Sequence, residues 1–198
     1  RADVAELVAG SFLDGAPVVA VSARSGEGLD ALKDVLLGIG GAAPGRGEDG
    51  PARLPIDRVF SMRGFGTVVT GTLVTGRLDA ERAATVLPGG RIVKVRGLQV
   101  HGARVSRAVA GQRVAVNLGG VDTGDLARGE TVADEGAFLA TRVVDVRLEL
   151  LASAHALRHG ARLRCHQGTS EVIGRIAVSA LVQTGSSPDE GGVTAEIA

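Results

Sequence analysis

Cysteine, aromatic residues and lysine are scarce in this sequence of 198 residues, and each scarcity excludes a class of protein. Cys165 is the only cysteine, so the chain has neither an internal disulfide framework nor a cysteine-rich zinc site. Aromatic residues make up 2% of the chain, without Trp or Tyr, which argues against a stacking platform for single-stranded nucleic acid. Lys33 and Lys94 are the only lysines, so almost all positive charge is arginine, a side chain suited to fixed ion pairs and anion recognition.

Net charge and long apolar runs are also missing. The 22 basic and 22 acidic residues give a formal charge of zero, which argues against bulk polyelectrolyte binding. No apolar run reaches membrane-spanning length and the N-terminus has no signal pattern, so we expect a cytoplasmic protein without a membrane partner. The sequence starts at Arg1, without Met, inside a predicted helix, and we therefore expect a fragment of a longer chain.

The first part of the chain has the texture of an α/β domain. The pattern predicts a helix over 2–13, a short buried strand over 17–22 and a second helix over about 28–37. The glycine-rich stretch 38–52 then indicates a linker. We place the α/β part at 1–40 and the linker at 41–52.

After the linker the pattern becomes that of β-strands. Val93 and Val95 alternate with polar residues, and so do Val114 and Val116 with their neighbours. Strands of this length without intervening helices predict a small barrel or sandwich over 53–135, followed by a second β domain. In that second domain, 136–198, we expect strands at 144–150, 161–166 and 170–182, a loop at 186–192, and a strand beginning at 193.

The glycines of GFGTVVTG, residues 64–71, invite comparison with a phosphate loop. Their spacing matches neither the dinucleotide-binding pattern nor the P-loop, and β-branched residues follow where a helix should begin. The better interpretation is a hairpin between strands 57–63 and 67–74, with Gly64 and Gly66 at positive φ in the turn.

Arg58 is the unusual residue of the first of these strands. If Val59 faces the core, Arg58 shares the opposite face with Phe60 and Met62, because side chains two apart point the same way. A half-apolar surface with a guanidinium group could hold a ligand with an anionic tip. The alternative is an arginine whose stem covers Phe60 and whose head pairs with Asp57 at the rim.

Other candidate sites are weaker. His155 and His159 have helical i, i+4 spacing, but no third metal ligand is evident and the segment has the pattern of a loop. Cys165 and His166 are adjacent on a predicted strand and point to opposite faces, so they cannot form a nucleophile-base couple with each other. We expect no catalytic residue and no metal site.

The segment VSARSGEGLDAL, residues 21–32, resembles the last guanine-recognition motif of GTPase domains, although a plain strand-to-helix loop would have the same pattern. Together with DRVFSMRGFGTVVTGTL, VKVRGLQVHG, AGQRVAVNLGGV, DLARGETV and ARLRCHQGTSEVIGRI, it makes the chain resemble the translational GTPases of the elongation factor Tu group. Within that group the chain is most similar to the selenocysteine-specific elongation factors of the SelB type. General elongation factor Tu has an acidic pair where this chain has Asp57-Arg58, Arg in place of Phe65, Asn in place of Arg113 and Leu in place of Asn117.

This resemblance implies a mainly β fold. An elongation-factor-type barrel, domain 2, would be followed by a second barrel and preceded by the α/β tail of a GTPase domain. It also implies site residues in three groups: a selenocysteine pocket of Asp57, Arg58 and Arg96; an aminoacyl-adenosine pocket of Phe60, Met62, Val68, Thr70 and Arg113; and a guanine-binding remnant at Ser22 and Ala23.

The implied partners are selenocysteyl-tRNA, the ribosome and, through a further C-terminal domain, a messenger RNA hairpin. GTP and Mg would serve the complete protein. We expect no cofactor for this chain alone and no GTP hydrolysis, because it contains no P-loop. The alternative is a non-catalytic β-barrel module of another translational GTPase, in which Arg58 and Arg96 form only surface or interdomain ion pairs.

Overall fold

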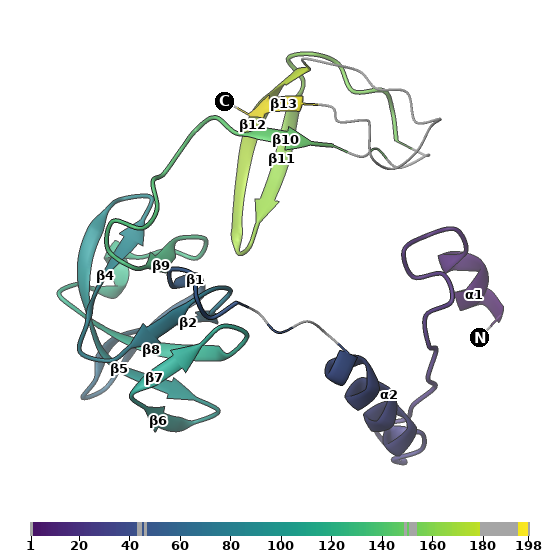
Figure 1. Ribbon diagram of the computed structural model, residues 1–198, viewed down its shortest axis with the longest axis horizontal. Coiled ribbons are helices and arrows are strands. Elements are labelled where there is room, and N and C mark those ends of the chain that lie inside the picture. The colour runs from purple at the N-terminus through teal and green to yellow at the C-terminus, as the bar shows by residue number, and fades with distance from the viewer. Residues whose placement is uncertain are drawn as a thin grey trace. The chain divides into compact units, whose positions relative to one another are not determined.

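A computed structural model describes residues 2–42, 45, 47–148, 150, 154–178 and 194–197. The chain divides into two compact units, residues 1–45 and 46–198, and each is described by itself. The first contains two helices, whereas the second consists of β-strands and one short 3-10 helix (Figure 1). The predicted mainly β fold is therefore confirmed.

The first unit holds helices α1 (Ala2–Val8) and α2 (Leu29–Ala42). The first helix is shorter than predicted, and the second continues into the stretch predicted as linker, because each added residue of a nucleated helix gains a backbone hydrogen bond. The prediction of a buried strand at 17–22 is wrong. The segment pairs with no strand of the described part of the chain, and Val18 and Val21 are nearly half exposed.

The centre of the second unit is a closed six-stranded barrel (Figure 1). Its strands pair around the circle in the order β4, β9, β1, β2, β8, β5 and back to β4. Every one of these neighbouring pairs is antiparallel. The strands are β1 (Arg53–Met62), β2 (Gly66–Thr72), β4 (Ala83–Leu87), β5 (Arg91–Val100), β8 (Arg113–Gly119) and β9 (Thr131–Ala133).

The barrel core is built by alternation along these strands, as the sequence predicted. Val93 and Val95 are buried, as are Val114 and Val116 of the facing strand β8. Leu54, Ile56, Val69 and Leu118 complete the middle of the same core. Alternation places every second side chain of these strands on the outer surface, where a site for a large ligand would have to lie.

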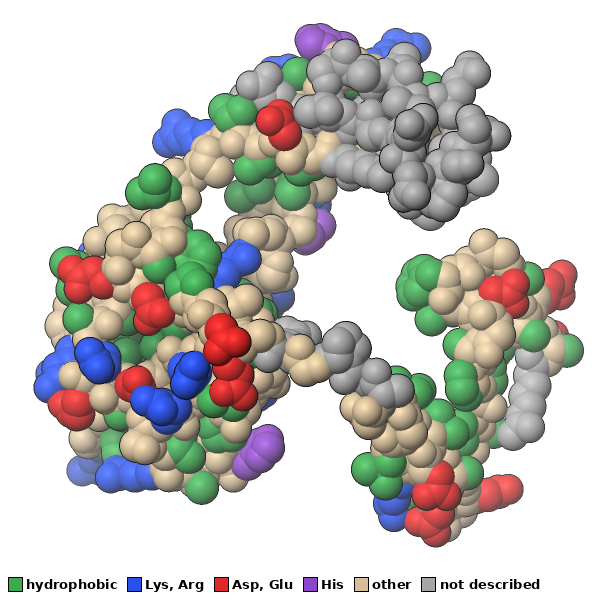
Figure 2. Space-filling model, viewed as in Figure 1, with side chains coloured by type: hydrophobic (Ala, Val, Ile, Leu, Met, Phe, Trp, Pro, Cys, Tyr) green, Lys and Arg blue, Asp and Glu red, His purple; other side chains and the backbone are tan. Residues whose placement is uncertain are grey.

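Smaller elements decorate the barrel. Strand β6 (Ala103–Val105) extends β5 as a hairpin, and β3 (Arg77–Asp79) pairs with β7 (Arg107–Val109). The 3-10 helix η1 (Thr123–Asp125) follows β8. Acidic and basic side chains alternate over the face of the barrel seen in Figure 2, in keeping with the zero net charge.

The described part of the second β block is a four-stranded sheet in the order β10, β13, β12, β11. The strand predicted at 144–150 is shorter in the structure, where Asp145–Arg147 pair with residues of β13. Residue 149, the expected loop 186–192 and the end of the expected strand 170–182 lie outside the described residues. The bounds are β10 (Asp145–Arg147), β11 (Arg162–Gln167), β12 (Ser170–Val178) and β13 (Thr194–Ile197).

Candidate functional site

The β1–β2 hairpin carries most of the predicted site residues. Gly64 and Gly66 have φ of 83° and 82°, and strands β1 and β2 pair from Ile56–Gly71 to Met62–Gly66. The Phe65 amide donates a hydrogen bond of 2.9 Å to the Met62 carbonyl, which closes the turn. The prediction of a hairpin with two positive-φ glycines is therefore confirmed.

A bulge in β1 directs Asp57 out of the regular ladder. Ile56 pairs with Gly71 and Arg58 with Thr70, so Asp57 is the extra residue between two pairs. Bulges commonly re-aim a side chain in this way. The Thr70 hydroxyl donates to Asp57 Oδ1 at 2.6 Å, and Arg113 donates through Nη2 to Oδ1 at 3.1 Å and through Nη1 to Oδ2. We call Asp57, Thr70 and Arg113 the Asp57 cluster.

This geometry keeps Asp57 ionised. The side chain is 22% exposed, and its partial burial acts to raise the pKa. The hydrogen bonds from Arg113 and Thr70 and the positive charges of Arg113 and Arg58 outweigh that cost, so the pKa of Asp57 lies below its usual range. The same pair raises the pKa of Arg113.

Arg58 does not pair with Asp57 in the way the alternative interpretation required, because the Asp57 oxygens accept hydrogen bonds from Arg113 and Thr70. Arg58 shares the outer face with Phe60 and Met62, as predicted, and these three residues lie opposite Thr70, Val68 and Gly66 of β2. Val68 is only 5% exposed although it lies on this outer face. The surface therefore has an apolar floor beside a guanidinium group.

Asn117 continues this row of side chains on β8, where it pairs with Val68. Its Nδ2 donates to the Phe65 carbonyl at 2.6 Å and so holds the hairpin turn, while its buried Oδ1 has no hydrogen-bond partner. The Phe65 ring in turn lies 5.2 Å from the Arg104 guanidinium carbon, a cation–π contact. The sequence showed Asn117 only as a departure from elongation factor Tu and gave no signal for this contact.

Arg96 is the extra residue of a second bulge, in β5. Val95 pairs with Leu118 and Gly97 with Asn117, so Arg96 has no residue opposite it. Its side chain is exposed while Val95 is fully buried, which confirms that it lies on the outer face. The sequence alternation predicted the face but not the bulge.

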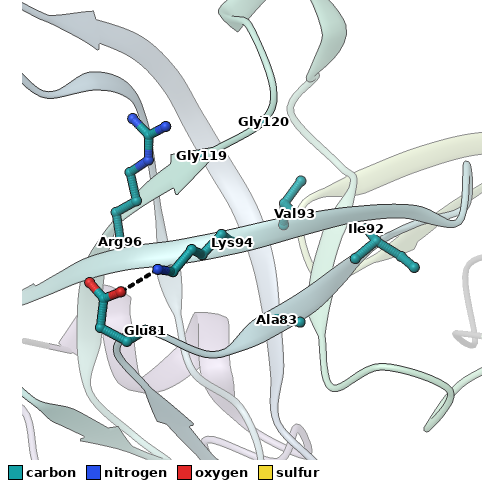
Figure 3. A pocket seen from close by; sticks show the side chains of 8 residues that line it. All are labelled: Glu81, Ala83, Ile92, Val93, Lys94, Arg96, Gly119 and Gly120. Atoms are coloured by element: carbon teal, nitrogen blue, oxygen red, sulfur yellow. Dashed lines mark ion pairs between the residues drawn. The ribbon is translucent and has the colours of Figure 1, made fainter.

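Arg96 lies between two cavities of about 510 and 380 Å³, both bordered by Gly120. The larger also contains Glu81 and Lys94, which form an ion pair at 2.5 Å. Figure 3 shows the Arg96 side chain pointing away from this pair and toward Gly119. The smaller cavity is lined by Gly66, Thr67, Leu118, Val121, Asp122 and Asp125.

The structure does not bring all predicted pocket residues into contact. Arg58 lies on β1 and Arg96 on β5, with β2 and β8 between them. The residues that line the two cavities include Arg96 but neither Asp57 nor Arg58. Among the described residues, neither arginine forms an ion pair, unlike Arg77, Arg91, Arg107, Arg113 and Arg164. Their binding roles stay predictions.

Ser22 and Ala23 lie in a tight loop of the first unit, just before α2. The Ser25 amide donates to the Ser22 hydroxyl at 3.2 Å, and the Gly26 amide donates to the Ser22 carbonyl at 2.8 Å. A Cβ on Gly28 would lie 2.1 Å from the Ala20 carbonyl oxygen, so the chain comes very close here. The loop is thus well defined, and its contact with guanine stays a prediction.

The described residues contain no group of three or more His, Cys, Asp and Glu side chains placed to hold a metal ion. Within the same residues, no helix is long and apolar enough to cross a membrane.

Comparison with known proteins points to one group. Residues 66–133 match the family model for elongation factor Tu domain 2. The chain is 43% identical to a selenocysteine-specific elongation factor of Desulfomicrobium baculatum over 88% of its length. It is 35% identical to a selenocysteine-specific elongation factor of Methanocaldococcus jannaschii over 67% of its length.

A solved structure agrees with these sequence matches. The crystal structure of a bacterial selenocysteine-specific elongation factor superposes with a TM-score of 0.79 and 28% identity, over 99% of this chain and 32% of the other. The chain spans 28% of the length of each of the two relatives above. It therefore corresponds to a part of these longer proteins.

Proposed function

Because the chain belongs to the selenocysteine-specific elongation factors of the elongation factor Tu group, we propose that it forms the selenocysteyl-tRNA-binding part of such a factor. In its GTP-bound form, the complete protein delivers this tRNA to the ribosome in the cytoplasm, at recoded UGA codons. A further C-terminal domain of the complete protein reads the messenger RNA hairpin. Residues 53–135 bind the aminoacyl end, and 136–198 form the second β domain, after the 1–40 tail and 41–52 linker.

The observation that carries this proposal is the state of two arginines on the outer face of the barrel. Arg58 and Arg96 are exposed and have no ion-pair partner among the described residues, while the ionised Asp57 is already paired with Arg113. A selenol is more acidic than a thiol and is largely anionic at neutral pH, so unpaired guanidinium groups favour it over a neutral seryl hydroxyl. In the alternative module, the two arginines would instead form surface or interdomain ion pairs, and among the described residues neither forms one.

The remaining residues have supporting roles in this proposal. Phe60, Met62 and Val68 supply the apolar surface against which the aminoacyl-adenosine lies. Thr70 and Arg113 fix Asp57 beside it. In the complete protein, the Ser22-Ala23 loop contacts the guanine of GTP, whose Mg-bound phosphates are held by parts of the factor outside this chain.

The test is a comparison of selenocysteyl-tRNA with seryl-tRNA binding to the complete factor loaded with a GTP analogue. Loss of one charge-assisted contact costs about 1.5 to 3 kcal/mol, so Arg58→Ala and Arg96→Ala should each reduce the preference for selenocysteyl-tRNA by roughly 10- to 100-fold. Seryl-tRNA affinity should change little, because that ligand carries no anionic tip.

Arg128→Ala is the matched control. Arg128 is also exposed and outside any ion pair of the described residues, but it lies in the loop before β9 and on neither strand of the hairpin. Its removal should leave the preference unchanged. If both Arg58→Ala and Arg96→Ala retain the full preference, the selenolate pocket is wrong and the alternative module is favoured.

A further inference from the structure

The side chain of Arg96 occupies space that any residue larger than glycine at position 119 would need. An ideal Cβ placed on Gly119 would lie 2.3 Å from Arg96 Nε, 3.0 Å from Cζ and 3.1 Å from Cδ. Real Cβ atoms essentially never come within 3.0 Å of another heavy atom. Gly119 is itself buried, at the end of β8, and Figure 3 shows Arg96 extending toward it.

The conflict at this position is steric, and it is with a flexible side chain that can move. The φ angle of Gly119 lies outside the left-handed region, so any residue could adopt its backbone conformation. The next residue is the contrast, because Gly120 has φ of 81° and open space around its Cβ position. A side chain at position 119 would therefore conflict with Arg96, whereas glycine at position 120 is favoured by the backbone conformation of the turn.

The charges around Arg96 leave its guanidinium available. Lys94 pairs with Glu81 at 2.5 Å, and Arg91 pairs with Asp125 at 3.1 Å. Asp122 and Asp125 line the smaller cavity beside Arg96, but neither forms an ion pair with it. A guanidinium that already lies where an anion will bind loses less conformational entropy when the anion arrives.

We propose that Gly119 is a positioning residue for specificity. Because it has no side chain, it leaves room for the Arg96 side chain to lie against β8. In that position the Arg96 guanidinium meets the anionic end of the bound aminoacyl group. This proposal rests on the proposed function for the identity of the ligand. The seating of Arg96 by Gly119 is a separate claim about the free protein. Adding a methyl group at 119 displaces Arg96 without removing its charge.

The functional experiment uses Gly119→Ala in the complete factor, again with selenocysteyl-tRNA and seryl-tRNA as probes. We expect about a tenfold loss of preference, no more than Arg96→Ala produces, with seryl-tRNA affinity unchanged. In an Arg96→Ala background, Gly119→Ala should cause no further loss, because the side chain that it displaces is gone. Gly89→Ala, at a glycine with open space and ordinary φ, is the control.

A second readout needs no tRNA. In this chain, the NMR signal of the Arg96 Nε–H group, identified by its disappearance in Arg96→Lys, should shift in Gly119→Ala and stay in place in Gly89→Ala. A crystal structure of Gly119→Ala should show the guanidinium moved off residue 119. An unmoved Arg96, with the backbone yielding instead, would overturn the inference whatever the tRNA results.

The two proposals fail in different ways. If Arg96→Ala lowers the preference for selenocysteyl-tRNA but Gly119→Ala does not, Gly119 is not a specificity residue. If Arg96→Ala itself leaves the preference intact, the selenolate contact of the proposed function is wrong and the specificity role of Gly119 falls with it. An additive loss in the double variant also contradicts the inference, because it shows that Gly119 acts independently of Arg96.

Discussion

Two opposing effects act on the pKa of Asp57. Partial burial disfavours its charge, while Arg113 and Thr70 supply three hydrogen bonds to its carboxylate. Because the net result is a lowered pKa, the folded state binds the Asp57 proton less tightly than the unfolded state does. Its stabilising contribution is therefore present above the unfolded-state pKa and is lost as the pH falls through the lower folded-state value.

We accordingly expect Asp57→Asn to lower the free energy of unfolding at pH 7 by about 1–2 kcal/mol, since a charge-assisted pair is replaced by a neutral contact. The difference from the wild-type chain should shrink as the pH falls below 3.8, the ordinary pKa of the carboxyl group. Urea unfolding followed by far-ultraviolet circular dichroism measures both values. Glu81→Gln, in a pair more than half exposed, is the control and should cost less than about 1 kcal/mol. An Asp57→Asn deficit that is as large at pH 3 as at pH 7 would contradict the argument.

The contacts of the Asp57 cluster could not be predicted from the sequence alone. Arg113 and Asp57 are 56 positions apart, and nothing in the local pattern pairs them. The sequence suggested Arg58 as the partner of Asp57 in one interpretation, because neighbours are the only candidates visible without a sheet register. The bulge that turns Asp57 toward Arg113 exists only once β1 and β2 are paired.

At the scale of elements, the periodicity of the sequence predicted most of the barrel strands. It failed for a segment that would need a pairing strand to become one. Buried and exposed positions of β5 and β8 follow the alternation read from the sequence, and the turn glycines are where the hairpin requires them. Residues 17–22 have the composition of a strand but no pairing partner in the described chain. A segment forms a strand only when another strand pairs with it, so the composition of residues 17–22 alone could not decide whether they form one.

Two glycines of β2 give a prediction at the same scale. A Cβ on Gly71 would lie 2.2 Å from the Pro55 carbonyl oxygen and 2.8 Å from Leu54 Cδ2, so Gly71→Ala should cost about 3 kcal/mol through overpacking against backbone that cannot move away. Gly66 has open space but φ of 82°, so Gly66→Ala should cost only about 1 kcal/mol.

Gly97→Ala completes this series as the control, because Gly97 has open space and an ordinary φ. Its unfolding free energy should stay within about 0.5 kcal/mol of wild type. Urea unfolding of the three variants gives the order. A Gly71→Ala variant as stable as Gly97→Ala would mean that β1 and β2 separate more easily than their close approach implies.

At the scale of the whole molecule, the balance of charge limits how this chain can meet RNA. The formal net charge is zero, and acidic and basic side chains are interspersed over the barrel face in Figure 2. Non-specific binding to RNA comes from neutralised phosphates and released counterions, and single-stranded binders add aromatic stacking, for which this chain has 2% aromatic residues. Affinity for an aminoacyl-tRNA would then depend on a few positioned groups.

We therefore expect this chain to bind a uridine homopolymer more weakly than about 10⁻⁴ M at physiological salt, measured by fluorescence anisotropy. A variant carrying Glu48→Lys and Glu135→Lys, two exposed carboxylates outside the ion pairs of the described residues, should bind more tightly and lose that gain as salt rises. Micromolar binding by the unmodified chain, with a steep dependence on salt, would show that its arginines act together as a polyelectrolyte surface. In that case the selectivity assigned to Arg58 and Arg96 would have to be separated from a general attraction to the tRNA backbone. Binding that stays weak while the preference for selenocysteyl-tRNA is retained would place the recognition in those positioned groups.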